Sequence, residues 1–567
     1  MGSSKVLTGA GRLSVLMAVS LTAMVAATSS KIAPDMPATG TARVIVQYAA
    51  SPSNSQLAGI PLLGGLLNEV LGIVNAVVCT LPVQQLSTLI ADPNVIYISP
   101  DRGVHGLLEY ANPTVNANIA LAHGFNGNGV GIALIDSGIN DHPDLHSQGL
   151  LGALGLSRVV YSQSFVGGTG TGDGFGHGTH VAGILAGDAK DSSSPADTHT
   201  FRGIAPNAVI VNLKALDDNG NGNDSTVIAA IQQAVLLKSL LNIRVMNLSL
   251  GRPVMESYQL DPLCKAVEYA WKNGITVVAA AGNYGRDNSA GNNGYGTITA
   301  PGDDPYVITV GAMKDMSTVI RSDDRIASYS SKGPTAIDHI VKPDIVAPGN
   351  LIVSLAQPAT ALYGETASMG LLVPFSYYEP AVAGYSTQYF RLSGTSMAAP
   401  MVSGAAALLL QQDSSLTPDQ IKARLMLTAT KTFPAYSIAT DPITGIGYTS
   451  QYDIFTVGAG YLDVWAALNS TARGTGSALS PTAVYDFGTQ TAALVPPAGS
   501  MWASSPDWST FTVWGSNVVD NGSFTVWGTG YIGSSTAVWG TFTVWGSSGD
   551  ASTFTVWGSG SPVVGEQ

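Results

Sequence analysis

Short apolar runs alternate along the middle of the chain with longer segments that repeat apolar residues at helical spacing. Residues 130–135 form a run typical of a buried parallel strand, and residues 275–283 form another that ends in an amide side chain. Residues 227–241 and 263–272 have the spacing of helices. The alternation predicts β-α-β units and an α/β fold with a doubly wound, mostly parallel sheet flanked by helices.

A helix that is apolar nearly all round is predicted from Pro400 to about Leu410. Ser396 lies at its start, within the segment Gly394–Pro400 (GTSMAAP). A hydroxyl at this end of a helix lies near free backbone N–H groups and the favourable end of the helix dipole, where an oxyanion would form in acyl transfer. Because most Gly-Thr-Ser triplets are turns or helix caps, a catalytic interpretation requires partners.

Candidate partners lie upstream. The buried run 130–135 delivers Asp136 at the carboxyl end of a strand, the usual position of sites in α/β sheets. His177 lies between glycines at the start of another apolar helix. A serine needs a base to remove its proton, and that base needs a carboxylate to orient it. Asp136, His177 and Ser396 therefore form a candidate catalytic triad.

Three segments together resemble a known family. Leu134–Ile139, His177–Gly183 and Gly394–Pro400 look like the three active-site signatures of the subtilisin-like serine proteases. The order Asp, His, Ser along the chain is also the order in subtilisin. The resemblance covers about residues 111–470 and implies a serine endopeptidase that hydrolyses peptide bonds through an acyl-enzyme.

The resemblance also assigns roles to residues. Asp136 would orient the base, His177 would act as general base and acid, and Ser396 would be the nucleophile. Asn283 would donate its side-chain N–H to the oxyanion, beside the backbone N–H of Ser396. No cofactor is implied for the chemistry, and the expected partners are polypeptide substrates.

A substrate groove is implied by two further segments. Residues 245–251 match an edge strand that pairs with an extended peptide, and residues 279–282 match the opposite wall of the first specificity pocket. Main-chain hydrogen bonds would give affinity and pockets would give preference. The residues expected to bind substrate are Ser249, Leu250, Gly251, Ala280, Ala281 and Gly282.

Other polar residues near the motifs have simpler interpretations. His180 would share a helix face with His177, and we expect it to make a structural hydrogen bond. His142 and His146 flank Pro143, which disfavours a continuous helix, and no His-Glu-x-x-His zinc motif occurs in the chain. We therefore expect a surface turn there.

Calcium is left open. Asp144 matches an aspartate that binds calcium in some members of the family, so a structural calcium ion is considered. The loop 188–194, however, does not resemble the family's usual calcium loop. No metal ligand is assigned on this basis.

The amino end predicts export. Lys5 and Arg12 precede an apolar run from Leu13 to Ala27 that ends in small residues, as in a signal peptide (1–27) cleaved after Ala27. The run is short for a membrane span, which needs about 20 residues. A retained membrane anchor is the alternative. We expect a secreted or cell-surface protein with no membrane span after signal removal.

Residues 28–110 resemble the inhibitory propeptide of secreted subtilisins. The pattern predicts a strand at 42–48, a helix at 82–89 and a second strand at 95–98. The propeptide would act as an intramolecular inhibitor, and self-cleavage would fall between His105 and Ala111, with Tyr110 preferred before the cut. The catalytic domain would span 111–470.

Composition limits the alternatives. Charged residues make up 11% of the 567 residues and the net charge is −13, which argues against nucleic acid as a partner. The two cysteines, Cys79 and Cys264, fall in the presumed propeptide and in an apolar helix. The mature enzyme would therefore keep one thiol and no intramolecular disulfide.

The remaining segments are harder to interpret. Residues 351–391 are expected to be an insertion near the nucleophile, and 471–501 a linker. The unit Phe-Thr-Val-Trp-Gly recurs within 502–567, at residues 511–515, 524–528, 542–546 and 554–558. Such repeats predict short strands, in a small β-solenoid or an extended tail. This tail is either a low-complexity appendage or a surface, glycan or secretion module.

Two functions remain from the sequence. The first is a secreted endopeptidase made as an autoprocessed zymogen. The second is a surface or binding protein in which the protease-like domain is a non-catalytic scaffold for the tryptophan repeats. The presence of Asp136, His177, Asn283 and Ser396 together favours the enzyme, because a scaffold would be free to lose any one of them.

Overall fold

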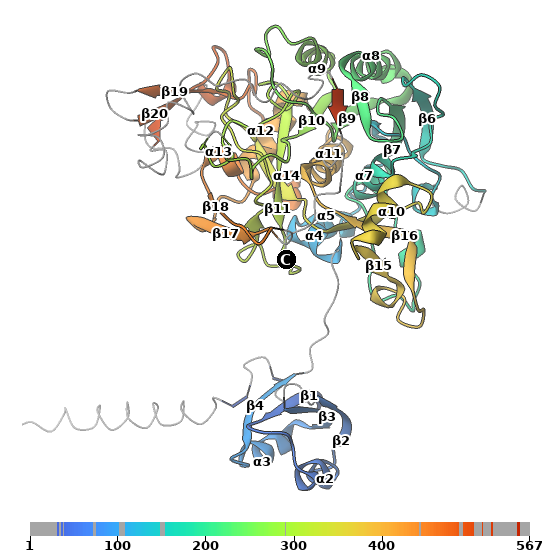
Figure 1. Ribbon diagram of the computed structural model, residues 1–567, viewed down its shortest axis with the longest axis vertical. Helices are drawn as coiled ribbons and strands as arrows, with labels where there is room; N and C mark the ends of the chain where they lie inside the picture. The colour runs from blue at the N-terminus through green and yellow to red at the C-terminus, as the bar shows by residue number, and fades with distance from the viewer. Residues whose placement is uncertain are drawn as a thin grey trace, which may run out of the picture. The chain divides into compact units, whose positions relative to one another are not determined.

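The chain divides into two compact units, residues 1–104 and 105–567, which the computed structural model describes separately (Figure 1). The predicted signal peptide and most of the repeat region lie outside the described residues. The structure describes residues 31–32, 36–37, 39–71, 75–100, 108–147, 154–289, 291–441, 444–486, 491–503, 513, 523–524 and 553–555.

The first unit is a four-stranded antiparallel sheet in the order β2-β3-β1-β4, with its own apolar core. Side chains of β1 alternate between buried and exposed, as a sheet with one covered face requires. The predicted helix at 82–89 starts later, because Pro82 ends β3 and a 3-10 turn, Val83–Gln85, comes first. The elements are β1 (Thr41–Tyr48), α2 (Asn54–Leu62), β2 (Leu66–Leu71), β3 (Ala76–Pro82), α3 (Leu86–Ile90) and β4 (Val95–Pro100).

The second unit is built on a sheet in the order β12-β11-β10-β9-β5-β7-β6, with β13 paired to β11. All pairs are parallel except β11 with β12, so the prediction of a mostly parallel α/β sheet is confirmed. The strands are β5 (Gly131–Asp136), β6 (Val159–Ser164), β7 (Val209–Lys214), β9 (Ile243–Leu248), β10 (Thr276–Ala280), β11 (Ile308–Lys314), β12 (Arg325–Ile326) and β13 (Ile345–Pro348).

Strand order reverses at β5. The chain places β6 and β7 on one side of β5 and then β9, β10 and β11 on the other. In open α/β sheets, sites form at the carboxyl ends of strands beside such a reversal. The carboxyl end of β5 is Asp136.

Helices flank this sheet: α7 packs against α11, and α8 packs against α9. Within the described ranges no helix is long and apolar enough to cross a membrane. Tyr110 lies inside α4, so a cut after it would require that helix to open. The helices are α4 (Leu108–Thr114), α5 (Ala117–Ala122), α7 (His177–Ala186), α8 (Asp224–Leu241), α9 (Pro262–Lys272), α10 (Ala361–Ser368), α11 (Thr395–Gln412), α12 (Pro418–Thr428), α13 (Ile454–Val457) and α14 (Val464–Asn469).

The range 351–391 forms a small antiparallel sheet, β14-β16-β15, with α10 beside it. Backbone N–H groups of Ala361 and Leu362 donate to the carbonyls of Gly174 and Phe175, at 3.0 Å each. This subdomain therefore holds the segment that leads to His177. Its strands are β14 (Ile352–Leu355), β15 (Leu372–Pro374) and β16 (Tyr385–Leu392).

The predicted linker 471–501 contains structure. β19 and β20 pair antiparallel, and Trp502 and Val513 are buried in a second apolar cluster with Phe455 of α13. Two short tail segments pair with other strands, β21 with β20 and β22 with β8. The remaining strands are β8 (Asn221–Asn223), β17 (Tyr436–Thr440), β18 (Gly447–Gln451), β19 (Thr482–Asp486), β20 (Thr491–Val495), β21 (Ser523–Phe524) and β22 (Thr553–Thr555).

Candidate active site

Asp136 and His177 meet at the carboxyl edge of the main sheet. β5 is buried along its length, and Oδ1 of Asp136 accepts a hydrogen bond of 2.8 Å from Nδ1 of His177. Gly178 permits this approach, because a Cβ there would lie 2.2 Å from the carbonyl oxygen of Gly138. Nε2 of His177 is buried and has no hydrogen-bond partner among the described residues. The imidazole is therefore held on one side and open on the other.

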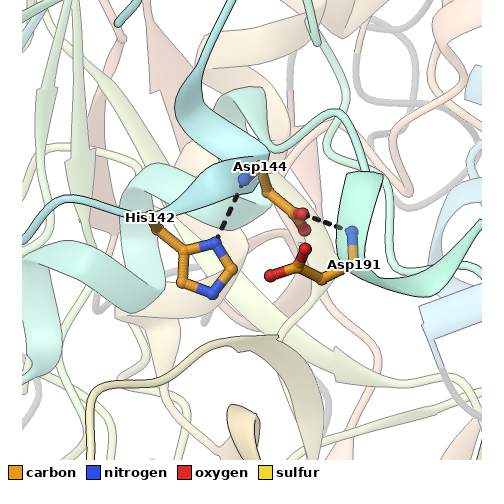
Figure 2. Close-up of side chains that lie close together, drawn as sticks. All are labelled: His142, Asp144 and Asp191. Atoms are coloured by element: carbon orange, nitrogen blue, oxygen red, sulfur yellow. Dashed lines mark hydrogen bonds between the residues drawn. The ribbon is translucent and has the colours of Figure 1, made fainter. Parts of the chain in front are cut away.

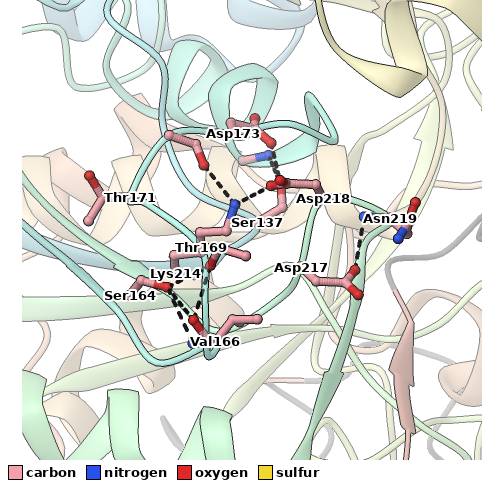
Figure 3. A network of polar contacts seen from close by, with 12 residues as sticks. Ser137, Ser164, Val166, Thr169, Thr171, Asp173, Lys214, Asp217, Asp218 and Asn219 are labelled. Atoms are coloured by element: carbon pink, nitrogen blue, oxygen red, sulfur yellow. Dashed lines mark hydrogen bonds and ion pairs between the residues drawn. The ribbon is translucent and has the colours of Figure 1, made fainter.

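Asp173, which is not among the residues predicted from the sequence, caps the helix that carries His177. Its Oδ1 accepts from Oγ of Ser137 over 2.8 Å, and both residues are labelled in Figure 3. The same Oδ1 accepts from the N–H of Gly176 (2.6 Å), and Oδ2 accepts from the N–H of Thr179 (2.8 Å). Burial raises the pKa of Asp173, against the effect of these hydrogen bonds. An acidic residue just before a helix start was the available signal.

Ser396 is the second residue of α11 and is buried. Its Oγ donates to the carbonyl oxygen of Ser249 over 3.1 Å, and Oγ of Ser249 donates back to the Ser396 carbonyl over 2.8 Å. That carbonyl needs a donor because Pro400 has no N–H to complete the helix. In this structure the Ser396 hydroxyl is thus turned toward Ser249 and not toward His177.

Asn283 lies next to the start of α11. Its Oδ1 accepts from the N–H of Thr395 (2.9 Å) and from Oγ1 of Thr395 (3.1 Å), which fixes the amide plane. Its Nδ2 is buried and has no partner among the described residues. A Cβ on Gly394 would lie 3.0 Å from this Nδ2, so Gly394 keeps the space in front of it open. The structure therefore leaves one oriented amide donor beside Ser396.

The predicted groove residues follow neighbouring parallel strands. Ala279 of β10 pairs with Leu248 of β9, so residues 280–282 and 249–251 leave the sheet at the same edge. β9 is paired on both sides, by β5 and β10, so the prediction of an edge strand is wrong. The residues after Leu248 lie beyond the last pair that β9 forms with β10. All six predicted groove residues are buried.

His180 has the structural role that we expected. Its Nε2 lies 3.0 Å from the carbonyl oxygen of Ile352, on the subdomain sheet. Burial and the nearby His177 lower the pKa of His180 to about 3, so the imidazole is neutral at physiological pH. It joins α7 to β14 rather than taking part in proton transfer.

Asp144 lies in a cluster with the buried His142 and the half-buried Asp191, and the ligand-type atoms of the three residues are within 4.8 Å of one another (Figure 2). The prediction of a surface turn is wrong, because His142 and Asp144 are 2% and 0% exposed. Oδ1 of Asp144 accepts from the N–H of Asp191 (2.8 Å) and Oδ2 accepts from the hydroxyl of Tyr389 (2.7 Å). Burial raises the pKa of Asp144 to about 6, against the hydrogen bond from Tyr389.

These surroundings do not fit calcium. The ion prefers six to eight oxygen ligands, whereas this cluster includes an imidazole. Both carboxylate oxygens of Asp144 already accept protein hydrogen bonds, and Nη2 of Arg158 donates to its carbonyl oxygen over 2.7 Å. A backbone N–H and a hydroxyl thus each donate to one carboxylate oxygen of Asp144, and a guanidinium donates to its backbone carbonyl.

Residues 127–447 match the sequence model of the Subtilase family. The chain is 36% identical over 339 residues to "Serine protease AprX" of Bacillus subtilis (strain 168), covering 59% of this chain and 69% of that protein. It is 32% identical over 371 residues to "Subtilisin E" of the same strain, covering 65% and 78%.

The match covers more than half of the chain, and the α/β fold agrees with it. The chain belongs to the subtilase family and is a serine endopeptidase, a hydrolase that acts on polypeptides.

Proposed function

We propose that hydrolysis proceeds through a triad of Asp136, His177 and Ser396. The supporting observation is the buried hydrogen bond from His177 to Asp136, which leaves Nε2 of His177 open. With Nδ1 protonated and held by Asp136, Nε2 carries the lone pair that a general base needs. α11, which carries Ser396, packs against α7, which carries His177.

In the first half of the reaction the Ser396 hydroxyl turns from the Ser249 carbonyl toward Nε2 of His177. As Oγ forms a bond to the scissile carbonyl carbon, its proton passes to Nε2. The tetrahedral oxyanion accepts hydrogen bonds from Nδ2 of Asn283 and from the backbone N–H of Ser396. His177 then gives its proton to the leaving amine, and the carbon–nitrogen bond breaks to leave an acyl-enzyme.

In the second half water replaces the amine. His177 removes a proton from water, which attacks the ester carbonyl, and the same donors stabilise the second oxyanion. Collapse returns the proton to Oγ of Ser396 and releases the carboxyl product. Every proton moves between substrate, water, Ser396 and His177, so the chemistry requires no cofactor.

We extend the proposal to substrate binding and maturation. An extended peptide would lie against residues 249–251 and 280–282 by strand addition. Residues 1–27 would direct export, and residues 28–110 would inhibit the catalytic domain until cleavage between His105 and Ala111. The independent core of the first unit supports a separate folding role for it.

The test compares casein hydrolysis by the purified protein with that by Ser396→Ala. The matched control is Ser403→Ala, which removes another buried hydroxyl from α11, one that donates to Asn247 over 2.8 Å. We expect S396A to lose hydrolysis and S403A to retain it. Equal residual hydrolysis by wild type and S396A would refute the assignment, and mass spectrometry of the products would locate the maturation cut.

A further inference from the structure

The last copy of the repeat pairs with a strand of the second unit. β22, Thr553–Thr555, lies antiparallel to β8, with Thr553 opposite Asn223 and Thr555 opposite Asn221. In Figure 1 the short red arrow of β22 lies beside β8. β8 has no other strand partner in the described part of the chain. The tail therefore completes an otherwise single strand.

β8 follows β7 along the chain, and β7 is a sheet neighbour of β5, which ends at Asp136. In the sheet, Asp136 at the end of β5 is opposite Lys214 at the end of β7. Nζ of Lys214 is hydrogen bonded to Oδ1 of Asp218 (2.5 Å) and to the carbonyl oxygen of Gly172 (2.7 Å) (Figure 3). This ties the turn before β8 to the loop before α7.

Contacts on both sides place β8 beside the active site. A Cβ on Gly220, just before β8, would lie 2.6 Å from the ring of Phe175, which is two residues before His177. Just after β8, Oδ1 of Asp224 accepts from Nε of Arg252 over 2.8 Å, and Arg252 follows the groove residues 249–251. β8 thus lies between the segment that leads to His177 and the segment that follows residues 249–251.

The direction of β22 follows from its pairing. Because the pair is antiparallel, the tail runs from Asn223 toward Asn221 as it passes from Thr553 to Thr555. It therefore runs toward Gly220, the residue that contacts Phe175 beside His177. An extended peptide that added to β8 would use the same backbone groups, since strand addition depends on main-chain hydrogen bonds.

We propose that the repeat strand Thr553–Thr555 is an intramolecular ligand of β8, beside the substrate groove, and that it competes with peptides for β8 and lowers their access to Ser396. This inference rests on the proposed function of Ser396. Tethering supports it, because a strand carried on the same chain binds in an intramolecular step, so a weak strand can compete with a free peptide. Two other repeat copies also contact the second unit. Val513 is buried in the apolar cluster that includes Phe455, and Phe524 of β21 pairs with β20.

The test uses two copies that have the same sequence, Thr-Phe-Thr-Val-Trp-Gly, at 541–546 and 553–558. The full-length double variant T553P/T555P removes two backbone N–H groups from β22, and T541P/T543P makes the same change in the other copy. Active enzyme is counted by fluorophosphonate titration. We expect T553P/T555P to raise kcat/KM for a short chromogenic peptide at least threefold through KM, whereas T541P/T543P matches wild type.

Hydrogen exchange of the amides at 221–223 gives a second measurement that does not depend on catalysis. We expect faster exchange in T553P/T555P than in T541P/T543P. Unchanged kcat/KM per titrated site, or unchanged exchange at 221–223, would overturn the tail proposal while leaving the triad intact. No hydrolysis and no labelling in any variant would instead overturn the proposed function, and with it the competition.

Discussion

Two buried polar clusters of the catalytic unit complete their hydrogen bonds differently. In the candidate active site, Oδ2 of Asp136, Nε2 of His177 and Nδ2 of Asn283 have no partner among the described residues. Around Asp344, by contrast, Nζ of Lys342 lies 2.8 Å from Oδ2 and Nζ of Lys422 lies 3.1 Å from Oδ1. The candidate active site thus contains unpaired polar atoms, whereas the Asp344 cluster pairs its charges with one another.

The pairing around Asp344 also sets its ionisation. Burial opposes the charge, but the ammonium groups of Lys342 and Lys422 outweigh it and lower the pKa of Asp344. Burial lowers the pKa of Lys422 to about 7 despite Asp344. An unpaired buried polar atom costs about 1–3 kcal/mol, so a protein normally avoids it. In the proposed mechanism the Ser396 hydroxyl would pair with Nε2 of His177 and the oxyanion would pair with Nδ2 of Asn283, so the candidate active site carries this cost for two atoms that the reaction would use.

The largest expected effect comes from removing His177, whose Nε2 has no partner among the described residues. We expect His177→Ala to lower kcat about a million-fold, the scale measured for the corresponding change in the relative subtilisin. The double variant H177A/S396A should lose no more than either single variant, because the residues act as a unit. The measurement is peptide hydrolysis by each purified variant. Additive losses would show that His177 and Ser396 act separately.

The next largest effect, on stability, comes from breaking the Asp344 cluster. Asp344→Asn should lower the free energy of unfolding by about 3–5 kcal/mol, because it leaves two buried ammonium groups without a counter-charge. Asp413→Asn is the control, since the pair of Asp413 with Arg473 is partly exposed and should cost under about 1 kcal/mol. Denaturant titration measures both. A similar cost for both variants would contradict the description of this cluster.

A smaller change in rate tests the unpaired amide. Asn283→Ala should lower kcat roughly 100- to 1000-fold with little change in KM, the range known for this oxyanion donor in subtilisin. Asn292→Ala removes an amide that is already paired, with Nδ2 donating to the carbonyl of Tyr295 over 2.5 Å. It should affect stability and leave kcat per folded molecule close to wild type. Equal loss of kcat in both would remove Asn283 from the mechanism.

The smallest effect concerns pH. Burial and the nearby Asp261 raise the pKa of Asp303 to about 7, so the folded state holds a proton that the unfolded state releases near pH 4. The stability that this proton contributes is present below pH 4 and is lost as the pH rises through 7. We expect Asp303→Asn to reduce the loss of melting temperature between pH 5 and 8. Glu256→Gln, which changes an exposed acid, is the matched control. Equal slopes for D303N and wild type would contradict this.

Local chemistry explains what the sequence could predict. Asp136, His177, Ser396 and Asn283 lie in short motifs whose neighbours also suit the proposed roles, so they could be proposed as site residues without a fold. Pro400 could likewise be interpreted, since it leaves a carbonyl without a donor, and Ser249 supplies the donor in the structure.

Tertiary neighbours explain what it could not. Asp344 and Lys422 are far apart in sequence, and nothing local indicates that they pair. His142 and Asp144 follow a turn pattern but are buried because Tyr389 of the 351–391 subdomain covers them. The internal position of β9 depends on strand order, which no single segment encodes.

Covalent labelling by a fluorophosphonate, followed by peptide mapping, tests most directly whether Ser396 is the nucleophile. We expect one phosphonyl group per folded molecule, bound to Oγ of Ser396, with labelling slowed greatly in H177A and absent in S396A. A label on another residue, or full labelling of S396A, would contradict it.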